Sequence, residues 1–155
     1  RGKNKKVKCL GKWVHMETPG KILNNKQTRL FAGRRVLVCE DSKLNQFLMQ
    51  KLLQSVGLTV DMAGNGAEGV ALAARYNYAV ILMDIIMPVM NGLEATKKIH
   101  ELRPGTPVVA LTGATSVEEI QKCMRAGLVD FLSKPIDSEA LYKMLDLLLG
   151  SGNVK

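Results

Sequence analysis

The sequence predicts an α/β fold in which a five-stranded parallel sheet is doubly wound, with helices on both faces. Five short apolar runs alternate with five segments whose apolar residues recur at helical spacing. The runs are mostly apolar, and AVILM at 79–83 is apolar throughout, which is typical of parallel strands buried on both faces. Hydrophobic residues make up 46% of the chain and aromatic residues only 5%. We therefore expect a globular domain with a mainly aliphatic core.

The first two strand–helix units lie between residues 35 and 75. The β-branched run RVLVC at 35–39 predicts a buried strand, and a helix at 44–56 follows it. Gly57 is a typical residue to end that helix. After a strand at 58–63, one apolar helix face is indicated by the i, i+3, i+4, i+7 spacing of Ala67, Val70, Ala71 and Ala74.

Three more units complete the pattern. The run AVILM at 79–83 predicts a strand, and the helix after it, at 93–102, ends before Pro104. A strand at 107–111 precedes a helix that the capping box of Ser116 and Glu119 begins and Gly127 ends. A fifth strand is expected at 129–132. The last helix has its apolar face at Leu141, Met144, Leu145 and Leu148.

Charge divides the chain into unequal parts. Residues 1–35 hold 11 Lys and Arg against one acid, whereas residues 36–155 hold 11 against 13. We predict a basic linker or the end of a preceding region at 1–33, a folded domain at 34–150 and a C-terminal tail at 151–155. A basic arm can bind nucleic acid or a membrane surface. The segment has no interleaved aromatic residues to stack on bases, so we expect a solvated linker that contacts neither.

Targeting and redox signals are missing from the sequence. No apolar run approaches the roughly 18 residues of a membrane-spanning helix, and no apolar stretch follows the basic N-terminal segment as in a signal peptide. The cysteines, Cys9, Cys39 and Cys123, match no zinc or redox spacing. We expect reduced thiols and a cytoplasmic domain, whether or not a longer parent protein is membrane-anchored.

Polar residues end four of the five predicted strands. Glu40 and Asp41 follow the first strand, Asp84 the third, Thr112 the fourth and Lys134 the fifth. A single polar residue at a strand end usually only faces water. Ligands of parallel sheets bind beyond the carboxyl ends of the strands, so we expect these five side chains to converge on one edge.

The chemistry of this set points to phosphoryl transfer. Three neighbouring carboxylates repel one another and favour a bound cation, and hard oxygen ligands suit Mg²⁺ or Mn²⁺. Phosphoryl transfer needs positioning and cations around the phosphoryl oxygens. Lys134 adds a second positive charge, and the Thr112 hydroxyl can donate a hydrogen bond. One carboxylate is then the nucleophile that forms an aspartyl phosphate.

Four segments resemble the receiver domain of response regulators and hybrid histidine kinases: VLVCED (36–41), LMDIIMPVMNG (82–92), ALTGAT (110–115) and FLSKP (131–135). The resemblance covers 34–150 and implies a flavodoxin-like (βα)5 fold with strand order 2-1-3-4-5. It implies that Asp84 takes phosphate from a phosphohistidine. It further implies that Asp41 and Asp84 hold Mg²⁺ directly, that Glu40 assists through water, and that the backbone carbonyl of Ile86 completes the ligands.

The same resemblance assigns the remaining site residues. Thr112 and Lys134 would contact the phosphoryl group, and Phe131 would move inward as Thr112 shifts. The Lys134–Pro135 peptide bond would be cis, which an X–Pro bond can adopt. The domain would catalyse its own phosphorylation and slow dephosphorylation.

The sequence departs from the family pattern at four positions. Glu40 stands where Asp is frequent, and Gly113 where Ala is frequent. Ile86 and Ala114 stand where some members place polar side chains that orient a hydrolytic water. Because neither side chain can form a hydrogen bond, we expect a comparatively long-lived phosphoryl group.

The biological setting follows from the resemblance. We expect part of a hybrid sensor histidine kinase, in which Asp84 receives phosphate from the kinase's phosphohistidine domain and a histidine phosphotransfer protein then receives it. A stand-alone response regulator is the alternative. Partner choice is expected on the first helix, with candidate surface residues Asn45, Gln46, Gln50 and Gln54.

Other functions compete for parts of the sequence. Residues 64–69 (GNGAEG) match the dinucleotide-binding pattern GxGxxG, follow a strand and have Asp84 twenty residues after Gly64. They lie in the second unit, however, and an NG dipeptide before a helix also predicts a simple turn. A flavodoxin-type binder would carry its phosphate loop after the first strand. A degenerate receiver would lack the intact set of acids, hydroxyl and lysine.

Overall fold

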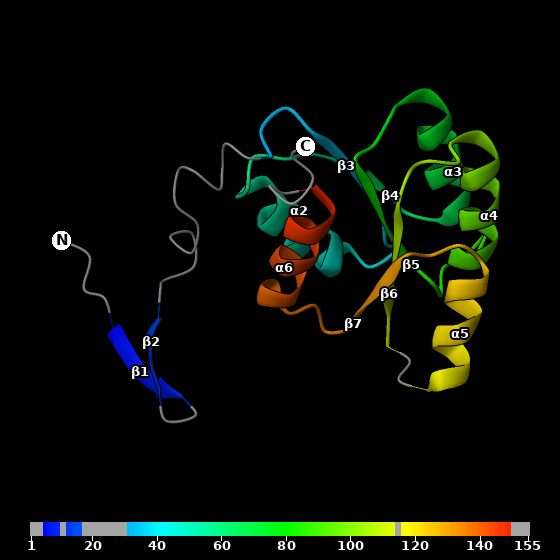
Figure 1. Cartoon of the computed structure of the whole chain (residues 1–155). Coiled ribbons are helices and arrows are strands. Elements are labelled where there is room, and N and C mark those ends of the chain that lie inside the picture. The colour runs from blue at the N-terminus through cyan, green and yellow to red at the C-terminus, as the bar shows by residue number, and fades with distance from the viewer. Residues whose placement is uncertain (1–4, 10–11, 17–30, 114–115, 150–155) are drawn as a thin grey trace.

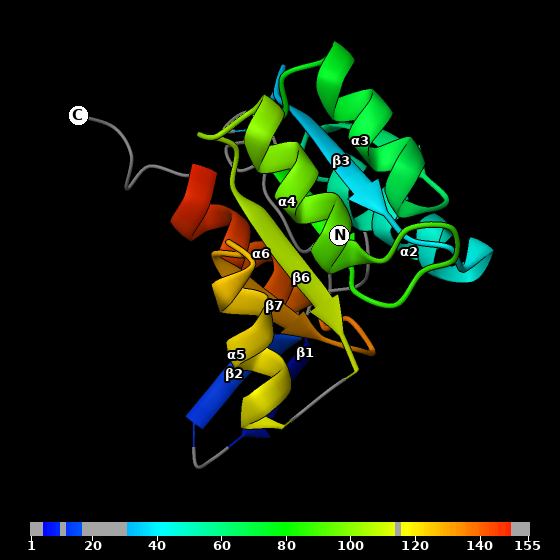
Figure 2. The same cartoon turned by 90° about the vertical axis from the view of Figure 1, so that its right-hand side faces the viewer.

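The structure is a computed structural model that describes residues 5–9, 12–16, 31–113 and 116–149 (Figure 1). Five parallel strands form one sheet in the spatial order β4-β3-β5-β6-β7. If the strands of this sheet are numbered along the chain from β3 as strand 1, their spatial order is 2-1-3-4-5, as predicted. Figure 2 shows β3 and β6 running in the same direction. The strands are β3 (Arg35–Cys39), β4 (Thr59–Ala63), β5 (Val80–Asp84), β6 (Val108–Thr112) and β7 (Asp130–Ser133).

Helices cover both faces of this sheet, also as predicted. Helices α2 and α6 pack on one face, and α3, α4 and α5 pack on the other (Figure 1). Their bounds are α2 (Lys43–Gln54), α3 (Gly66–Arg75), α4 (Gly92–Leu102), α5 (Val117–Arg125) and α6 (Ser138–Leu149).

The core has two layers because successive strand residues point to opposite faces. Val36 and Val38 face the α2–α6 side, whereas Leu37 and Cys39 face the other helices. All five residues of β5 are buried. A strand with both faces covered needs apolar residues at nearly every position, which explains the largely apolar runs of β3, β5 and β6. The edge strands β4 and β7 are partly exposed and contain polar residues.

Local polar signals set the helix ends. Ser42, Asn65, Asn91 and Ser116 precede α2, α3, α4 and α5, and each side chain accepts a hydrogen bond from the backbone N–H three residues later. Gly57 and Gly127 follow α2 and α5 with φ of 92° and 104°. Residues with side chains rarely adopt this left-handed conformation, so these glycines end the helices as predicted.

The N-terminal segment contains an element that the sequence did not predict. Strands β1 (Lys5–Cys9) and β2 (Lys12–Met16) pair antiparallel, with Val7 opposite Val14. Five-residue strands give a weak period-two signal, and lysine is infrequent in strands. The predicted domain boundaries at 33/34 and 150/151 stay predictions, and the tail at 151–155 lies outside the described residues.

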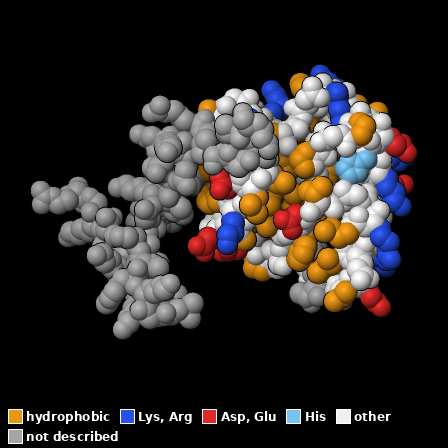
Figure 3. Space-filling view, in the orientation of Figure 1, with side chains coloured by type: hydrophobic (Ala, Val, Ile, Leu, Met, Phe, Trp, Pro, Cys, Tyr) orange, Lys and Arg blue, Asp and Glu red, His pale blue; other side chains and the backbone are white. Residues whose placement is uncertain are grey.

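The described surface is mixed in character. Figure 3 shows hydrophobic side chains between α6 and α5, over the edge strand β7. Val129 and Leu147 are among the large exposed hydrophobic residues. In the described part of the chain, no helix combines the length and apolar character needed to cross a membrane.

Candidate functional site

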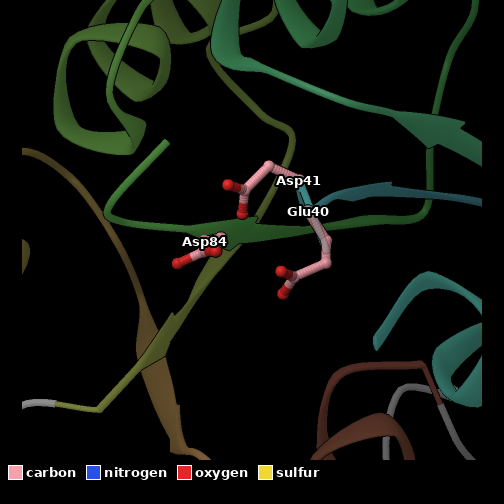
Figure 4. Close-up of side chains that lie close together, drawn as sticks. All are labelled: Glu40, Asp41 and Asp84. Atoms are coloured by element: carbon pink, nitrogen blue, oxygen red, sulfur yellow. The ribbon is translucent and has the colours of Figure 1, made fainter. Parts of the chain in front are cut away.

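Three carboxylates meet at the carboxyl edge of the sheet. Glu40 and Asp41 follow β3 directly, and Asp84 is the last residue of β5. The two strands pair in parallel with Cys39 opposite Met83, so their ends coincide. One oxygen from each carboxylate lies within 4.8 Å of the others. Figure 4 shows the three side chains extending into a common region.

Lys134 joins this cluster from the loop after β7. Its Nζ donates to Asp84 Oδ2 at 2.9 Å and lies 3.1 Å from Glu40 Oε1. Its backbone N–H donates to the Thr112 carbonyl at 2.8 Å, which ties it to the end of β6. The Lys134–Pro135 peptide bond is cis, the geometry that the resemblance implies.

The three acids differ in their surroundings. Glu40 is 1% exposed, and its second oxygen accepts a hydrogen bond from the Ser42 N–H at 3.1 Å. Asp84 is 4% exposed, and its Oδ1 accepts from the Ile86 N–H at 3.3 Å. Asp41 is exposed, and within the described residues no hydrogen bond or ion pair engages its carboxylate.

Burial and neighbouring charge set the ionisation of the pair at the centre. Burial raises the pKa of Asp84, Glu40 raises it further, and the hydrogen bond from Lys134 only partly opposes this, so the pKa lies above its ordinary value. Burial lowers the pKa of Lys134, but hydrogen bonds to Asp84 and Glu40 outweigh burial and the pKa is raised. Lys134 therefore stays protonated at neutral pH, and Asp84 carries unfavourable negative charge.

The charges leave room for a divalent cation. Three carboxylates face one ammonium group, so two negative charges remain uncompensated. Asp41 and Asp84 offer oxygens as direct ligands for Mg²⁺. Glu40 is held by the Lys134 ammonium group and the Ser42 N–H, and its predicted role through water stays a prediction. The residues present thus suit the predicted ion, and the Ile86 carbonyl stays a prediction as a further ligand.

Residues 36–146 match the family model described as the response regulator receiver domain. This chain belongs to that receiver domain family. The receiver match begins one residue inside β3, spans the other four strands of the parallel sheet and includes all the acids of the cluster.

Relatives of two kinds resemble this receiver domain. Hybrid signal transduction histidine kinase G of Dictyostelium discoideum is 39% identical over 81% of the chain, which spans only 4% of that kinase. Two-component response regulator 24 of Arabidopsis thaliana is 39% identical over 72% of the chain and 81% of its own length. The family thus includes both a kinase-linked and a stand-alone arrangement.

Two solved structures share the fold. The receiver domain of the Pseudomonas aeruginosa sensor histidine kinase PA1611, solved with a magnesium ion in its active site cleft, is 34% identical with a TM-score of 0.72. It covers 77% of this chain and aligns over all of its own. The Saccharomyces cerevisiae receiver domain of Ssk1, solved with the histidine phosphotransfer protein Ypd1, gives 28% identity, a TM-score of 0.73 and coverage of 77% and 90%.

The other predicted site residues occupy the same edge or lie near it. Thr112 is the last residue of β6, is 8% exposed and pairs with Ser133, next to Lys134. Phe131 lies on β7 opposite Ala110 and packs, half-buried, on the α3–α5 side. Their roles in switching stay predictions. Ala114 lies outside the described residues.

The glycine pattern at 64–69 has a structural explanation within this receiver domain. Asn65 accepts from the Glu68 N–H, and Glu68 accepts from the Gly64 N–H at 2.8 Å, so the start of α3 is capped from within. A Cβ on Gly66 would meet the Met90 carbonyl oxygen, and one on Gly69 would lie 2.6 Å from Cys39 Sγ. Gly66 and Gly69 thus allow close packing, and the NG dipeptide lies at the bend before α3, as the turn interpretation predicted.

The predicted partner surface on α2 has a different character from the one expected. Gln54 is exposed, but Asn45, Gln46 and Gln50 are partly buried, and Gln46 donates to the Glu40 carbonyl at 2.6 Å. Three of the exposed side chains of α2 are large and apolar: Leu44 at 67%, Phe47 at 56% and Leu48 at 49%. Their i, i+3, i+4 spacing resembles a core-facing stripe, whereas Met49 and Leu53 form the buried face.

Gly92 is a positioning residue that the sequence did not reveal as such. It begins α4, and a Cβ at this position would meet the Asp84 carbonyl oxygen and approach Ile85 Cα at 2.8 Å. Its N–H donates to the Ile85 carbonyl at 2.8 Å. The N-terminus of α4 therefore presses against the backbone of the phosphoacceptor candidate, and no side chain fits between them.

Proposed function

We propose that this receiver domain takes a phosphoryl group from a phosphohistidine onto Asp84 in a His–Asp phosphorelay. The observation that carries the proposal is the cluster of Asp84, Glu40 and Asp41 around the Lys134 ammonium group at the carboxyl edge of the sheet. A carboxylate held among cations is the arrangement that an aspartyl-phosphate intermediate requires.

The step is a displacement at phosphorus. A carboxylate oxygen of Asp84 forms the new O–P bond, the N–P bond of the phosphohistidine breaks, and the imidazole nitrogen keeps the electron pair. Mg²⁺, or Mn²⁺, held by Asp41 and Asp84 would neutralise charge on the phosphoryl oxygens. Lys134 lies 2.9 Å from Asp84 and is placed to pair with a phosphoryl oxygen, while the Thr112 hydroxyl donates a second contact.

The phosphorylated state then has two uses. Thr112 would shift toward the phosphoryl group and Phe131 would turn inward, which changes the surface near β7. A histidine phosphotransfer protein would alternatively take the phosphoryl group from Asp84. The similarity to a hybrid histidine kinase supports a place in such a kinase, and we propose a cytoplasmic location for the domain. The similarity to a response regulator supports the stand-alone alternative.

The partner is expected to dock on α2 beside the site. A hollow of about 430 Å³ lies between α2 and the segment that follows β7, lined in part by Leu48, Leu52 and Ile136. Exposed Leu44 and Phe47 continue this apolar surface along the helix. An apolar groove beside a helix suits a partner helix with an apolar face, and the Ssk1 receiver solved with Ypd1 supports a histidine phosphotransfer protein as the partner.

A transfer assay tests the function. Radiolabelled phospho-Ypd1 mixed with this chain and Mg²⁺ is expected to lose label to the wild-type chain and to lose none to an Asp84→Asn variant. Chelation of Mg²⁺ with EDTA is expected to slow the transfer strongly. Label that moves equally to both proteins would contradict the assignment of Asp84.

The phosphoryl group is expected to persist. Ile86 is 83% exposed beside the site and cannot orient a hydrolytic water. An Ile86→Asn variant adds an amide at this exposed position without disturbing the core. We expect the variant to lose radiolabel faster than the wild-type chain after donor removal. Rapid loss from the wild-type chain would contradict the expected long lifetime.

A further inference from the structure

The loop between β5 and α4, residues 85–91, contains a strained residue. Val89 has a φ of 70°, and it alone has a positive φ among the described residues other than glycine. The Met90 N–H donates to the Pro88 carbonyl at 2.7 Å, which closes a γ-turn around Val89. γ-Turns with a positive φ at the central residue are rare and strained. A β-branched residue such as valine is a clear outlier in this conformation, because its Cβ crowds the backbone.

Packing does not compensate for this strain. The Val89 side chain is 82% exposed, and Ile86 on the same loop is 83% exposed. The Val89 isopropyl group therefore adds almost nothing to the core, and glycine or asparagine would adopt the same turn with less strain. Burial in the core therefore does not account for valine at this position. An outlier of this kind next to a reactive group suggests a function.

The turn is held rigidly beside the acid cluster. The loop begins one residue after Asp84, and it ends where Gly92 presses on the Asp84 backbone. Within the loop, the Met90 carbonyl accepts from the Gly66 N–H at 3.1 Å. Asp84 is 4% exposed, so a phosphohistidine must approach it closely. The protein that carries the histidine then has to cover the surface around the opening.

We propose that Val89 is a docking residue, which the γ-turn presents to an apolar patch beside the phosphohistidine of the partner protein. The inference rests on the proposed phosphorelay function and adds a specificity-determining contact to it. Ile86 and Val89 are both exposed and apolar, and they lie on a loop whose two ends adjoin Asp84. The matching surface is a histidine surrounded by apolar side chains, and an acidic or strongly polar surface would not fit it.

Paired donors separate docking from chemistry. Each variant is phosphorylated once by acetyl phosphate, which needs no protein surface, and once by phospho-Ypd1. For Val89→Asn and Val89→Gly we expect an unchanged rate with acetyl phosphate and a rate about tenfold lower with phospho-Ypd1. Val89→Ile keeps an apolar side chain and is expected to retain the wild-type rate. Val129→Asn alters another exposed valine, at the start of β7 and so at the opposite edge of the sheet, and is expected to change neither rate.

Thermal unfolding supplies the second readout. Val89→Gly is expected to unfold at a higher temperature than the wild-type chain because strain is released, whereas Val129→Gly is expected to unfold at a lower one. Equal rates with phospho-Ypd1 for all variants would overturn the inference, as would a wild-type chain that accepts phosphate only from acetyl phosphate. A lower unfolding temperature for Val89→Gly would overturn the argument from strain. Failure with acetyl phosphate in the wild-type chain would instead contradict the proposed function.

Discussion

At the scale of single residues, the site depends on the charge balance between Lys134 and the neighbouring carboxylates. The ammonium group contacts both Asp84 and Glu40, and it is the one cation that the described residues bring to the three acids. Its position could be predicted from the sequence because the carboxyl ends of parallel strands share one edge. The distances could not be predicted, since they depend on the turn after β7.

Removing this cation is expected to destabilise the metal-free protein. For Lys134→Met we expect a loss of about 2 kcal/mol in the free energy of unfolding. Breaking a fully buried ion pair costs roughly 3–5 kcal/mol, and the loss is expected to be smaller here because a quarter of the Lys134 side chain is exposed. Mg²⁺ is expected to restore part of the loss. Chemical denaturation with and without Mg²⁺ measures both values. The control Lys122→Met breaks an exposed pair of 3.9 Å and is expected to cost less than about 1 kcal/mol. Equal losses in both variants would contradict the account.

A second residue-scale prediction concerns alkaline stability. Burial, with a hydrogen bond to Asp61 at 2.7 Å, raises the pKa of Tyr78 above its ordinary value. A raised pKa means that the folded state binds the proton more tightly. Tyr78 therefore contributes stability that is fully present below about pH 10 and is lost as pH rises through the raised pKa.

Replacing the tyrosine should remove this pH dependence. Tyr78→Phe is expected to cost about 1 kcal/mol at pH 8, because Asp61 loses one hydrogen bond and keeps Arg35 at 2.9 Å. Between about pH 10 and 11 the wild-type advantage is expected to shrink by roughly 1 kcal/mol, because the unfolded tyrosine then loses its proton and the folded one keeps it. Urea unfolding of both proteins across this range measures the difference. A difference that stays constant with pH would contradict the raised pKa.

At the scale of secondary-structure elements, the close contact of α4 with β5 fixes Asp84. Gly92→Ala places a methyl group against the Asp84 carbonyl oxygen. We expect a loss of about 1–3 kcal/mol in the free energy of unfolding and slower phosphorylation by acetyl phosphate, because small displacements of reacting groups lower rates strongly. Gly105→Ala is the matched control, since nothing lies within 4 Å of a Cβ there. Unchanged phosphorylation of Gly92→Ala would show that the helix does not position Asp84.

Elements differed in how well the sequence predicted them. The five strands of the parallel sheet and the first four of their helices were predicted with boundaries within about two residues, because apolar runs and capping residues are strong local signals. The β1–β2 hairpin was missed, since its short lysine-rich strands give little pattern. The exposure of Leu44, Phe47 and Leu48 on α2 was also missed. An apolar stripe on a helix does not reveal whether core or a partner covers it.

At the scale of the whole molecule, strand order turns distant segments into one site. Asp84 and Lys134 are separated by 50 positions, and Glu40 comes from a third segment. Placing β3 and β5 side by side, with β6 and β7 beyond them, brings all three to the same edge. This assembly was predictable from the sequence pattern. The strained turn at Val89 was not, because it arises from tertiary contacts of the loop with α3 and α4.

Phosphorylation by acetyl phosphate, followed by intact mass spectrometry, tests the central claim most directly. With Mg²⁺ present, the wild-type chain is expected to gain the mass of one phosphoryl group. The Asp84→Asn variant is expected to gain none, and neither protein is expected to gain mass when the ion is chelated. An equal gain in both proteins, or an equal gain with and without Mg²⁺, would contradict the assignment of the acid cluster as a metal-assisted phosphoacceptor site.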